Sequence, residues 1–320
     1  MYPMKLAPVY KSYLWGGTRF KTMFRKGNRE GTTAEIWALS CHEAGLSCIE
    51  NGGFCGKTLR EALALHPEWL GEKNRTPGEC PVLIKLLDAE KPLSVQVHPS
   101  DETADWAKGE RGKTEMWYIL HAEPGAAIYY GLRRSLSAAE LIRHAQNGTI
   151  EQDLRKIPVH PGETYAVWPG TIHALGAGIV AAEVQQSSDT TFRVYDYDRR
   201  DAQGNRRPLH LARAVQTVNF TPDWPEIDNR RNRNVPVSSS RQTEIFHCDF
   251  FRVFKMEGKI ADGFLCGDDS FQAWLWLKGE GILLWQRENE RLSPGDCFFL
   301  PAGLGRYAVQ GMGEALRVCI

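Results

Sequence analysis

The stretch Pro92-Leu-Ser-Val-Gln-Val-His98 alternates strictly between apolar and polar side chains. Successive side chains of a β-strand point to opposite faces, so Ser94, Gln96 and His98 share one face and the apolar residues share the other. On the inner face of a β-barrel, three polar groups in a row need a common partner such as a metal or a bound ligand. On a half-exposed strand the same groups face water, and the stretch alone does not decide between the two.

The rest of the chain is typical of a mainly β protein. Its 320 residues include 30 glycines and 17 prolines, and most of the chain consists of short apolar segments between these turn formers. Helical patterns are confined to residues 58–70, residues 135–148 and a shorter stretch, 101–108, with Ser100 as its N-cap. We therefore expect jelly-roll β-barrel domains with a few helices.

A weak internal repeat predicts two domains. Residues 161–173 (PGETYAVWPGTIH) align with residues 294–306 (PGDCFFLPAGLGR), and each copy has the pattern of a turn, a buried strand and a second glycine turn. Arg306 stands where the first copy has His173. Residues 221–240 are polar and rich in proline, asparagine and arginine, which is typical of a linker. We expect a larger domain with helical insertions over residues 1–225, and a second barrel without metal over residues 226–320.

Charge and cysteine content exclude several function classes. The 39 basic and 39 acidic residues balance, so the chain has no global attraction to nucleic acid or to an anionic membrane. The N-terminus does not resemble a signal peptide, and no stretch approaches the roughly 20 apolar residues of a membrane helix. The eight cysteines include no CxxC pair, which disfavours a zinc ribbon or a redox site. We expect reduced thiols in a cytoplasmic protein.

Two later segments carry further candidate side chains. In Lys113-Thr-Glu115-Met-Trp117 the alternation puts Lys113 and Glu115 on one face with Trp117, either in a pocket wall or at the exposed end of a strand. Arg193 lies in another alternating segment, where it is either a paired charge at the end of a barrel or an anion-binding group. His173 follows a Pro-Gly turn and enters an apolar stretch, where a histidine is either structural or a ligand.

Taken together, these segments resemble the type I mannose-6-phosphate isomerases of the cupin superfamily, in their short bacterial form. The similarity runs from residue 13 to residue 199, and it is carried by YLWGG (13–17), EIW (35–37), IKLLDA (84–89), PLSVQVHP (92–99), GKTEMWY (112–118), GTIHAL (170–175) and QQSSDTTFRVYDYDR (185–199). The last third resembles the family mainly through the barrel repeat. The resemblance implies the interconversion of mannose 6-phosphate and fructose 6-phosphate through a cis-enediol.

The resemblance also implies roles for individual residues. A Zn²⁺ ion is expected at four ligands, which are Gln96, His98, Glu115 and His173. The catalytic arginine of the family corresponds to Arg193, and its active-site lysines to Lys85 and Lys113. We expect Lys113 to act as the base or to hold the phosphate, Lys85 to contact the phosphate, and Ser94 to contact the substrate. One departure is Trp168 followed by a proline, where the cupin pattern has proline two residues before the glycine.

Other functions fit parts of the pattern. A sugar-binding cupin without catalysis would have no need for both Lys113 and Arg193 beside a metal. A cupin oxygenase presents three histidines and a glutamate, so Gln96 in a histidine position argues against that class. An isomerase of a related or unphosphorylated sugar is a further alternative, because the sequence contains no dedicated phosphate-binding loop.

Overall fold

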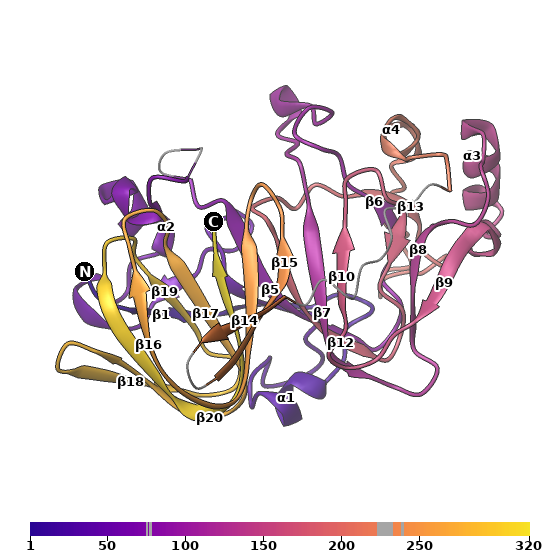
Figure 1. The fold of residues 1–320 in the computed structure, drawn as a ribbon. Coiled ribbons are helices and arrows are strands. Elements are labelled where there is room, and N and C mark those ends of the chain that lie inside the picture. The colour runs from indigo at the N-terminus through magenta and orange to yellow at the C-terminus, as the bar shows by residue number, and fades with distance from the viewer. Residues whose placement is uncertain (75, 77–78, 223–232, 238–239) are drawn as a thin grey trace.

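The computed structural model describes residues 1–74, 76, 79–222, 233–237 and 240–320. Over these residues the fold is mainly β, with three antiparallel sheets and peripheral helices (Figure 1). The six-stranded sheet lies in the middle of the layers. Its strands, in spatial order, are β10 (Thr164–Val167), β7 (Glu115–Ala122), β12 (Ile179–Gln186), β5 (Val82–Ala89), β3 (Glu35–Leu39) and β2 (Val9–Lys11).

A five-stranded sheet covers one face of this central sheet. Its strands, in spatial order, are β13 (Phe192–Tyr195), β6 (Val95–Val97), β11 (His173–Ala174), β8 (Ala127–Leu132) and β9 (Leu154–Pro158). Trp117 and Ile119 of β7 pack with Ile128 and Tyr130 of β8 in one hydrophobic core between the two sheets. The opposite face of the five-stranded sheet packs against helices α3 (Ala138–Gln146) and α4 (Leu211–Thr217).

A nine-stranded sheet covers the other face of the central sheet. It contains β14 (Arg233–Val237), β15 (Ser240–His247), β16 (Arg252–Cys266), β20 (Gly305–Cys319), β17 (Gln272–Trp285), β18 (Glu288–Leu292), β19 (Cys297–Leu300), β1 (Met4–Ala7) and β4 (Cys48–Ile49). Met116, Tyr118 and Leu120 of β7 pack with Phe271 and Leu275 in the core on this side. The strict alternation along β7 therefore serves two cores, one on each face.

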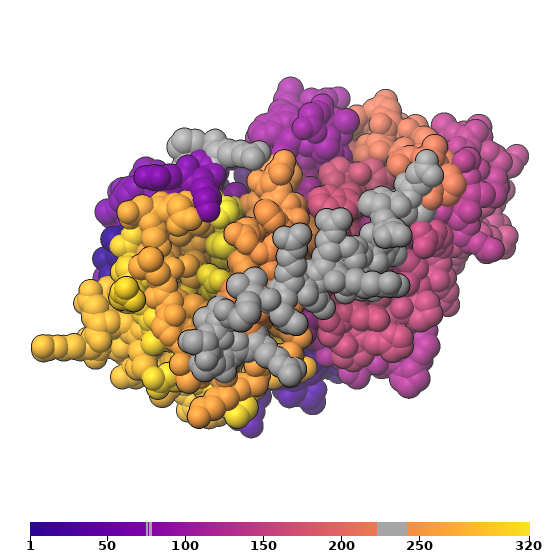
Figure 2. All heavy atoms as spheres, viewed as in Figure 1, coloured from indigo at the N-terminus to yellow at the C-terminus, as the bar shows by residue number. Residues whose placement is uncertain are grey.

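The expectation of a mainly β fold with few helices is confirmed. The pairing of the strands leaves the sheets open, so the structure is sandwich-like and the closed barrel is not confirmed. Figure 2 shows the C-terminal strands, in orange and yellow, at one end of the molecule and the magenta segments at the other. Among the described residues, no helix is long and apolar enough to cross a membrane.

The domain boundary at residues 225 and 226 stays a prediction. The first strand of the chain, β1, pairs with β19, so residues from the expected first domain join the sheet of the C-terminal strands. The predicted linker, residues 221–240, falls largely outside the described residues, although residues 233–237 form strand β14.

The two repeat copies have the same local structure. Strand β10 and strand β19 occupy equivalent positions in the two copies, four residues each. Gly162 and Gly170 flank the first strand with φ values of 92° and 82°, and Gly295 and Gly303 flank the second with 81° and 77°. Only glycine adopts this left-handed conformation at no steric cost, which explains why both glycines recur in the two turns.

Two of the three predicted helices are confirmed. Helix α2 (Leu59–Leu65), continued by the 3₁₀ helix η2 (Pro67–Leu70), and helix α3 each begin with a capping box, formed by Thr58 and by Ser137. The predicted helix over residues 101–108 is wrong, because only the 3₁₀ turn η3 (Trp106–Lys108) forms there. The carboxylate of Asp101 instead accepts a hydrogen bond from the Gly112 amide. Helices α1 (Arg19–Met23) and α4 were not predicted.

Candidate metal centre

The candidate site lies between the five-stranded and six-stranded sheets. In the five-stranded sheet, Gln96 of β6 is paired directly with His173 of β11 on one side and with Arg193 of β13 on the other. Residues paired directly across strands present their side chains on the same face. Glu115, the first residue of β7, comes from the six-stranded sheet, and His98 follows the end of β6.

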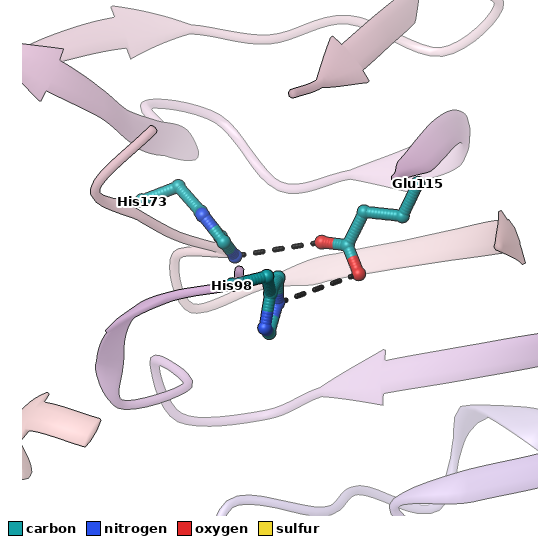
Figure 3. Close-up of side chains that lie close together, drawn as sticks. All are labelled: His98, Glu115 and His173. Atoms are coloured by element: carbon teal, nitrogen blue, oxygen red, sulfur yellow. Dashed lines mark ion pairs between the residues drawn. The ribbon is translucent and has the colours of Figure 1, made fainter. Parts of the chain in front are cut away.

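Three of the predicted ligands converge in space (Figure 3). Nε2 of His98 lies 3.6 Å from Oε2 of Glu115, and Nε2 of His173 lies 3.4 Å from Oε1. All three side chains are buried, and their candidate ligand atoms lie within 4.8 Å of one another. Ligands about 2.1 Å from a tetrahedral zinc ion lie about 3.4 Å apart, so the spacing suits such an ion.

The tautomers of both histidines are set by backbone carbonyls. Nδ1 of His98 lies 2.8 Å from the carbonyl oxygen of Thr190, and Nδ1 of His173 lies 2.8 Å from that of Thr171. A carbonyl only accepts, so each Nδ1 carries the hydrogen and each Nε2 presents its lone pair to Glu115. This is the usual arrangement behind histidine ligands of metals.

Gln96 completes the cluster. Its Nε2 atom lies 3.4 Å from Nε2 of both His98 and His173, and its Oε1 atom accepts a hydrogen bond from Ser94 at 3.3 Å. Rotating the amide by half a turn would exchange its nitrogen and oxygen, so that Oε1 faces the two histidine Nε2 atoms as a metal ligand would. Ser94 is buried beside the amide, which is where a side chain that orients Gln96 would lie.

Burial sets the protonation of this cluster. Burial lowers the pKa of His173 to about 4 and that of His98 well below its usual value, with Lys113 adding to the effect at His98. Burial also raises the pKa of Glu115 to about 7, although Lys113 opposes the shift. Among the described residues, Oε1 of Glu115 has no hydrogen-bond partner, and Oε2 is in an ion pair with Lys113. Two neutral imidazoles facing a buried carboxylate, one oxygen of which lacks a hydrogen-bond partner, are a donor set that fits a divalent metal ion.

Lys113 lies beside these ligands. Its Nζ atom is 2.8 Å from Oε2 of Glu115 and 3.3 Å from Nε2 of His98, and the side chain is buried. The predicted pairing of Lys113 with Glu115 on one face is therefore observed. The alternative, an exposed pair at the end of a strand, is wrong because both side chains are buried.

Lys85 belongs to a second buried charge cluster. Its Nζ atom lies 3.2 Å from Oε1 of Glu183 and 3.9 Å from Oε2 of Glu35. Trp117 donates its indole hydrogen to Glu183 at 2.9 Å. Burial lowers the pKa of Lys85, but the two carboxylates outweigh it and the net shift is upward, so the amine is an ammonium ion. Burial likewise raises the pKa of Glu183, but Lys85 outweighs it and keeps the group ionised.

Arg193 keeps hydrogen-bonding capacity beside Gln96. Its Nη1 atom donates to the carbonyl oxygen of Pro208 at 2.9 Å, while its buried Nε–H has no partner among the described residues. Burial lowers the pKa of the guanidinium, and the charge of Arg207 adds to this effect. Arginine nevertheless stays charged at physiological pH, so the free N–H is a donor for an anionic ligand.

The unusual turn before His173 is anchored to the site itself. The Gly170 amide donates to the carbonyl oxygen of His98 at 2.9 Å, and the Thr171 amide closes a turn on Trp168. The displaced proline therefore leaves His173 within reach of Glu115.

Comparisons with known proteins identify the family of this chain. Residues 4–114 match the family model of the type I phosphomannose isomerase catalytic domain, and residues 241–320 match that of the mannose-6-phosphate isomerase cupin domain. The chain is 36% identical to the mannose-6-phosphate isomerase ManA of Bacillus subtilis over 318 residues, which cover 98% of each chain. It belongs to the type I mannose-6-phosphate isomerase family.

Further members of this family extend the match. The mannose-6-phosphate isomerase of Streptococcus mutans is 39% identical, with 97% of this chain and 95% of the relative covered. The crystal structure of the Bacillus subtilis mannose 6-phosphate isomerase has a TM-score of 0.92 at 34% identity, with both chains covered completely. The resemblance inferred from the motifs is therefore confirmed over the full length, including the C-terminal third.

Sequence reasoning missed several residues of the isomerase site. Glu183 stands in the middle of the apolar run of β12, and a lone acid in such a run was the available signal. Glu35, within the EIW motif, was quoted only for the resemblance. The carbonyl groups of Thr171 and Thr190 have no signal in the sequence, because every residue carries the same backbone acceptor.

Proposed function

We propose that this chain interconverts mannose 6-phosphate and fructose 6-phosphate through a cis-enediol, with Zn²⁺ held by Gln96, His98, Glu115 and His173. The observation that carries the proposal is the convergence of two histidine Nε2 atoms on the two oxygens of a buried glutamate. Membership of the isomerase family supplies the reaction class.

The four ligands suit a reaction that creates negative charge. A zinc ion bound there supplies a Lewis acid that polarises the substrate oxygens and makes the adjacent C–H more acidic. Two neutral imidazoles, one amide and one carboxylate leave a net charge near +1 with a divalent ion, which favours a substrate that becomes anionic. The amide in place of a third histidine sets the site apart from the oxygenase pattern.

We assign proton transfer to Lys113. During the reaction a proton leaves C2 of the open-chain aldose and returns at C1. Lys113 is a basic group in contact with two of the proposed ligands, so it lies within reach of a sugar bound against them.

Arg193 is proposed to stabilise the oxygen that becomes negative in the enediol. It is paired with Gln96 across the sheet, and its unpartnered buried Nε–H supports a ligand on that side. A fixed donor aimed at developing charge in a dry site contributes strongly to catalysis.

Lys85 and Ser94 are proposed to contact the sugar. Glu183 and Glu35 already neutralise the ammonium of Lys85 and would repel a phosphate dianion, so a sugar hydroxyl suits this position better than the phosphate contact expected from the sequence. Ser94 is proposed to act through the amide of Gln96, with which it forms a hydrogen bond. The cytoplasmic location and the two-domain division also stay inferences from the sequence.

The deciding experiment compares mannose 6-phosphate with free mannose on one purified sample whose metal content is determined. We expect fructose 6-phosphate to form from the phosphorylated sugar, with little turnover of mannose. Turnover of mannose alone would contradict the proposed substrate. Binding of mannose 6-phosphate without any turnover would identify a sugar-binding protein.

A further inference from the structure

Four consecutive backbone amides before Glu115 are each held by a partner outside strand β7. The Arg111 amide donates to Oγ1 of Thr190 at 3.0 Å, and the Gly112 amide donates to Oδ1 of Asp101 at 2.9 Å. The Lys113 amide donates to the carbonyl oxygen of Pro99 at 3.0 Å. The Thr114 amide donates to Oε1 of Gln186 at 2.8 Å. The backbone that carries Lys113 is therefore fixed one residue at a time.

The two side chains in this set also bind each other. Gln186 donates its amide hydrogen to Oδ2 of Asp101 at 3.0 Å, so one carboxylate and one amide bridge the Gly112 and Thr114 amides on either side of Lys113. Gln186 is buried at the end of strand β12. A side-chain carbon at position 112 would lie 2.5 Å from the Asp101 amide nitrogen and 2.5 Å from Oδ1, which explains the glycine there.

The same segment is connected to a proposed metal ligand. Thr190 holds the Arg111 amide through its hydroxyl, and its carbonyl accepts the Nδ1 hydrogen of His98. Pro99, which holds the Lys113 amide, directly follows His98 in the chain. The contact of 3.3 Å between Lys113 Nζ and His98 Nε2 thus joins two groups whose backbones are fixed to each other.

We propose that Asp101 and Gln186 form a brace that positions Lys113 for proton transfer. The brace rests on the proposed function, because it assigns no chemistry of its own. In the part of the chain that the structure describes, neither side chain has a hydrogen bond to the four proposed ligands, so both are positioning residues. A group that transfers protons needs its nitrogen held to within a fraction of an ångström, and a displacement of about 1 Å costs about 100-fold in rate.

A reciprocal exchange of the two functional groups tests the brace. In D101N the amide group of the new asparagine faces the amide group of Gln186, and both are donors. In Q186E the carboxylate of the new glutamate faces that of Asp101, and both are acceptors. Each single variant therefore loses the hydrogen bond between positions 101 and 186. In the double variant D101N/Q186E the new asparagine donates to the new glutamate. Its oxygen still accepts from Gly112, and the glutamate still accepts from Thr114. Net charge and all three hydrogen bonds are restored.

The four proteins are compared by kcat, KM and zinc content, with D249N as a control because Asp249 lines the same groove as Asp101 and Gln186. We expect kcat to fall about tenfold or more in each single variant and to recover to within about twofold in the double variant. The KM and the zinc content of all variants should equal those of the wild-type protein, and D249N should also keep the wild-type kcat. The assignment would be overturned by a wild-type kcat in the single variants, by a double variant whose kcat is as low as that of the single variants, or by loss of zinc.

Hydrogen exchange separates this inference from the proposed function. Exchange of the amides of residues 112–114 should be faster in both single variants and return to the wild-type rate in the double variant. Unchanged exchange in the single variants would overturn the brace even if the enzyme is an isomerase. A wild-type protein without isomerase activity would overturn the proposed function, and the exchange rates would still decide whether the brace exists.

Discussion

His173 and Glu115 belong to different sheets, and yet Nε2 of the histidine faces Oε1 of the glutamate at 3.4 Å. The site therefore lies across the interface between the five-stranded and six-stranded sheets. A metal ion bound here links the two sheets, and its binding free energy also stabilises the fold.

The first prediction concerns stability. Added zinc should raise the free energy of unfolding by about 2.7 kcal/mol when its free concentration is about 100 times its Kd, because the ion binds the folded protein and not the unfolded chain. Urea unfolding with and without zinc measures this difference. The variant His98→Ala should show little zinc-dependent stabilisation. Equal stabilisation of both proteins would place the ion elsewhere.

The metal content of single variants tests the ligands themselves. His98→Ala removes one of the convergent Nε2 atoms and should lower zinc content to a small fraction of the wild-type value, as measured by elemental analysis after dialysis. His160→Ala is the matched control, because His160 is exposed and contacts Glu163. Wild-type zinc content in His98→Ala would remove His98 from the ligand set.

The pH dependence of metal binding follows from Glu115 and His173. The pKa of Glu115 is raised to about 7 and that of His173 is lowered to about 4, so at pH 6 the metal-free site holds its proton on the carboxylate and not on His173. Metal binding must displace that proton. Affinity should therefore fall about tenfold per pH unit below pH 7 and level off above it.

Calorimetric titration in buffers of different ionisation enthalpy measures the protons released. We expect about one proton at pH 6, about half a proton at pH 7 and almost none at pH 8.5. Affinity independent of pH between 6 and 7 would show that the metal-free carboxylate is already ionised.

The role of Arg193 separates catalysis from metal binding. Arg193→Ala should keep wild-type zinc content and lose about 100-fold to 1000-fold in kcat, which is the usual cost of removing one donor to a developing oxyanion. The control is Arg306→Ala, because Arg306 is exposed and stands at the position of His173 in the second repeat copy. Undiminished turnover in Arg193→Ala would show that the arginine is not catalytic.

The buried ion pair of Lys85 and Glu183 should contribute to the free energy of unfolding as well as to the site. Glu183→Gln leaves Lys85 with Glu35, 3.9 Å away, as its remaining carboxylate partner in this cluster. Removing one partner of a buried ion pair costs about 3 kcal/mol, and urea unfolding measures it. A loss below about 1 kcal/mol would mean that Glu35 or water compensates for the missing charge.

Local features of the site could be predicted from the sequence. Strand alternation placed Gln96 beside His98 and Lys113 beside Glu115, and the observed contacts of 3.4 Å and 2.8 Å agree. The helices that begin at Ser137 and Thr58 were predicted because their apolar spacing is a local signal, and the structure adds a capping box to each.

Features that depend on contacts between sheets could not be predicted from the residues alone. Alternation relates neighbours on one strand, and nothing in it brings His173 to Glu115 from another sheet; the family resemblance supplied that connection. Glu183 was overlooked because β12 is otherwise apolar or neutral. The helix expected over residues 101–108 failed because Asp101 binds the distant Gly112 amide, which local periodicity cannot reveal.

The central claim is that the metal bound at His98, Glu115 and His173 is required for isomerisation of mannose 6-phosphate. The direct test measures fructose 6-phosphate formation by the purified protein before chelation, after removal of metal with a chelator, and after addition of Zn²⁺. We predict that activity is lost together with the metal and returns with about one zinc ion per chain. Full activity in the metal-free protein would contradict the account.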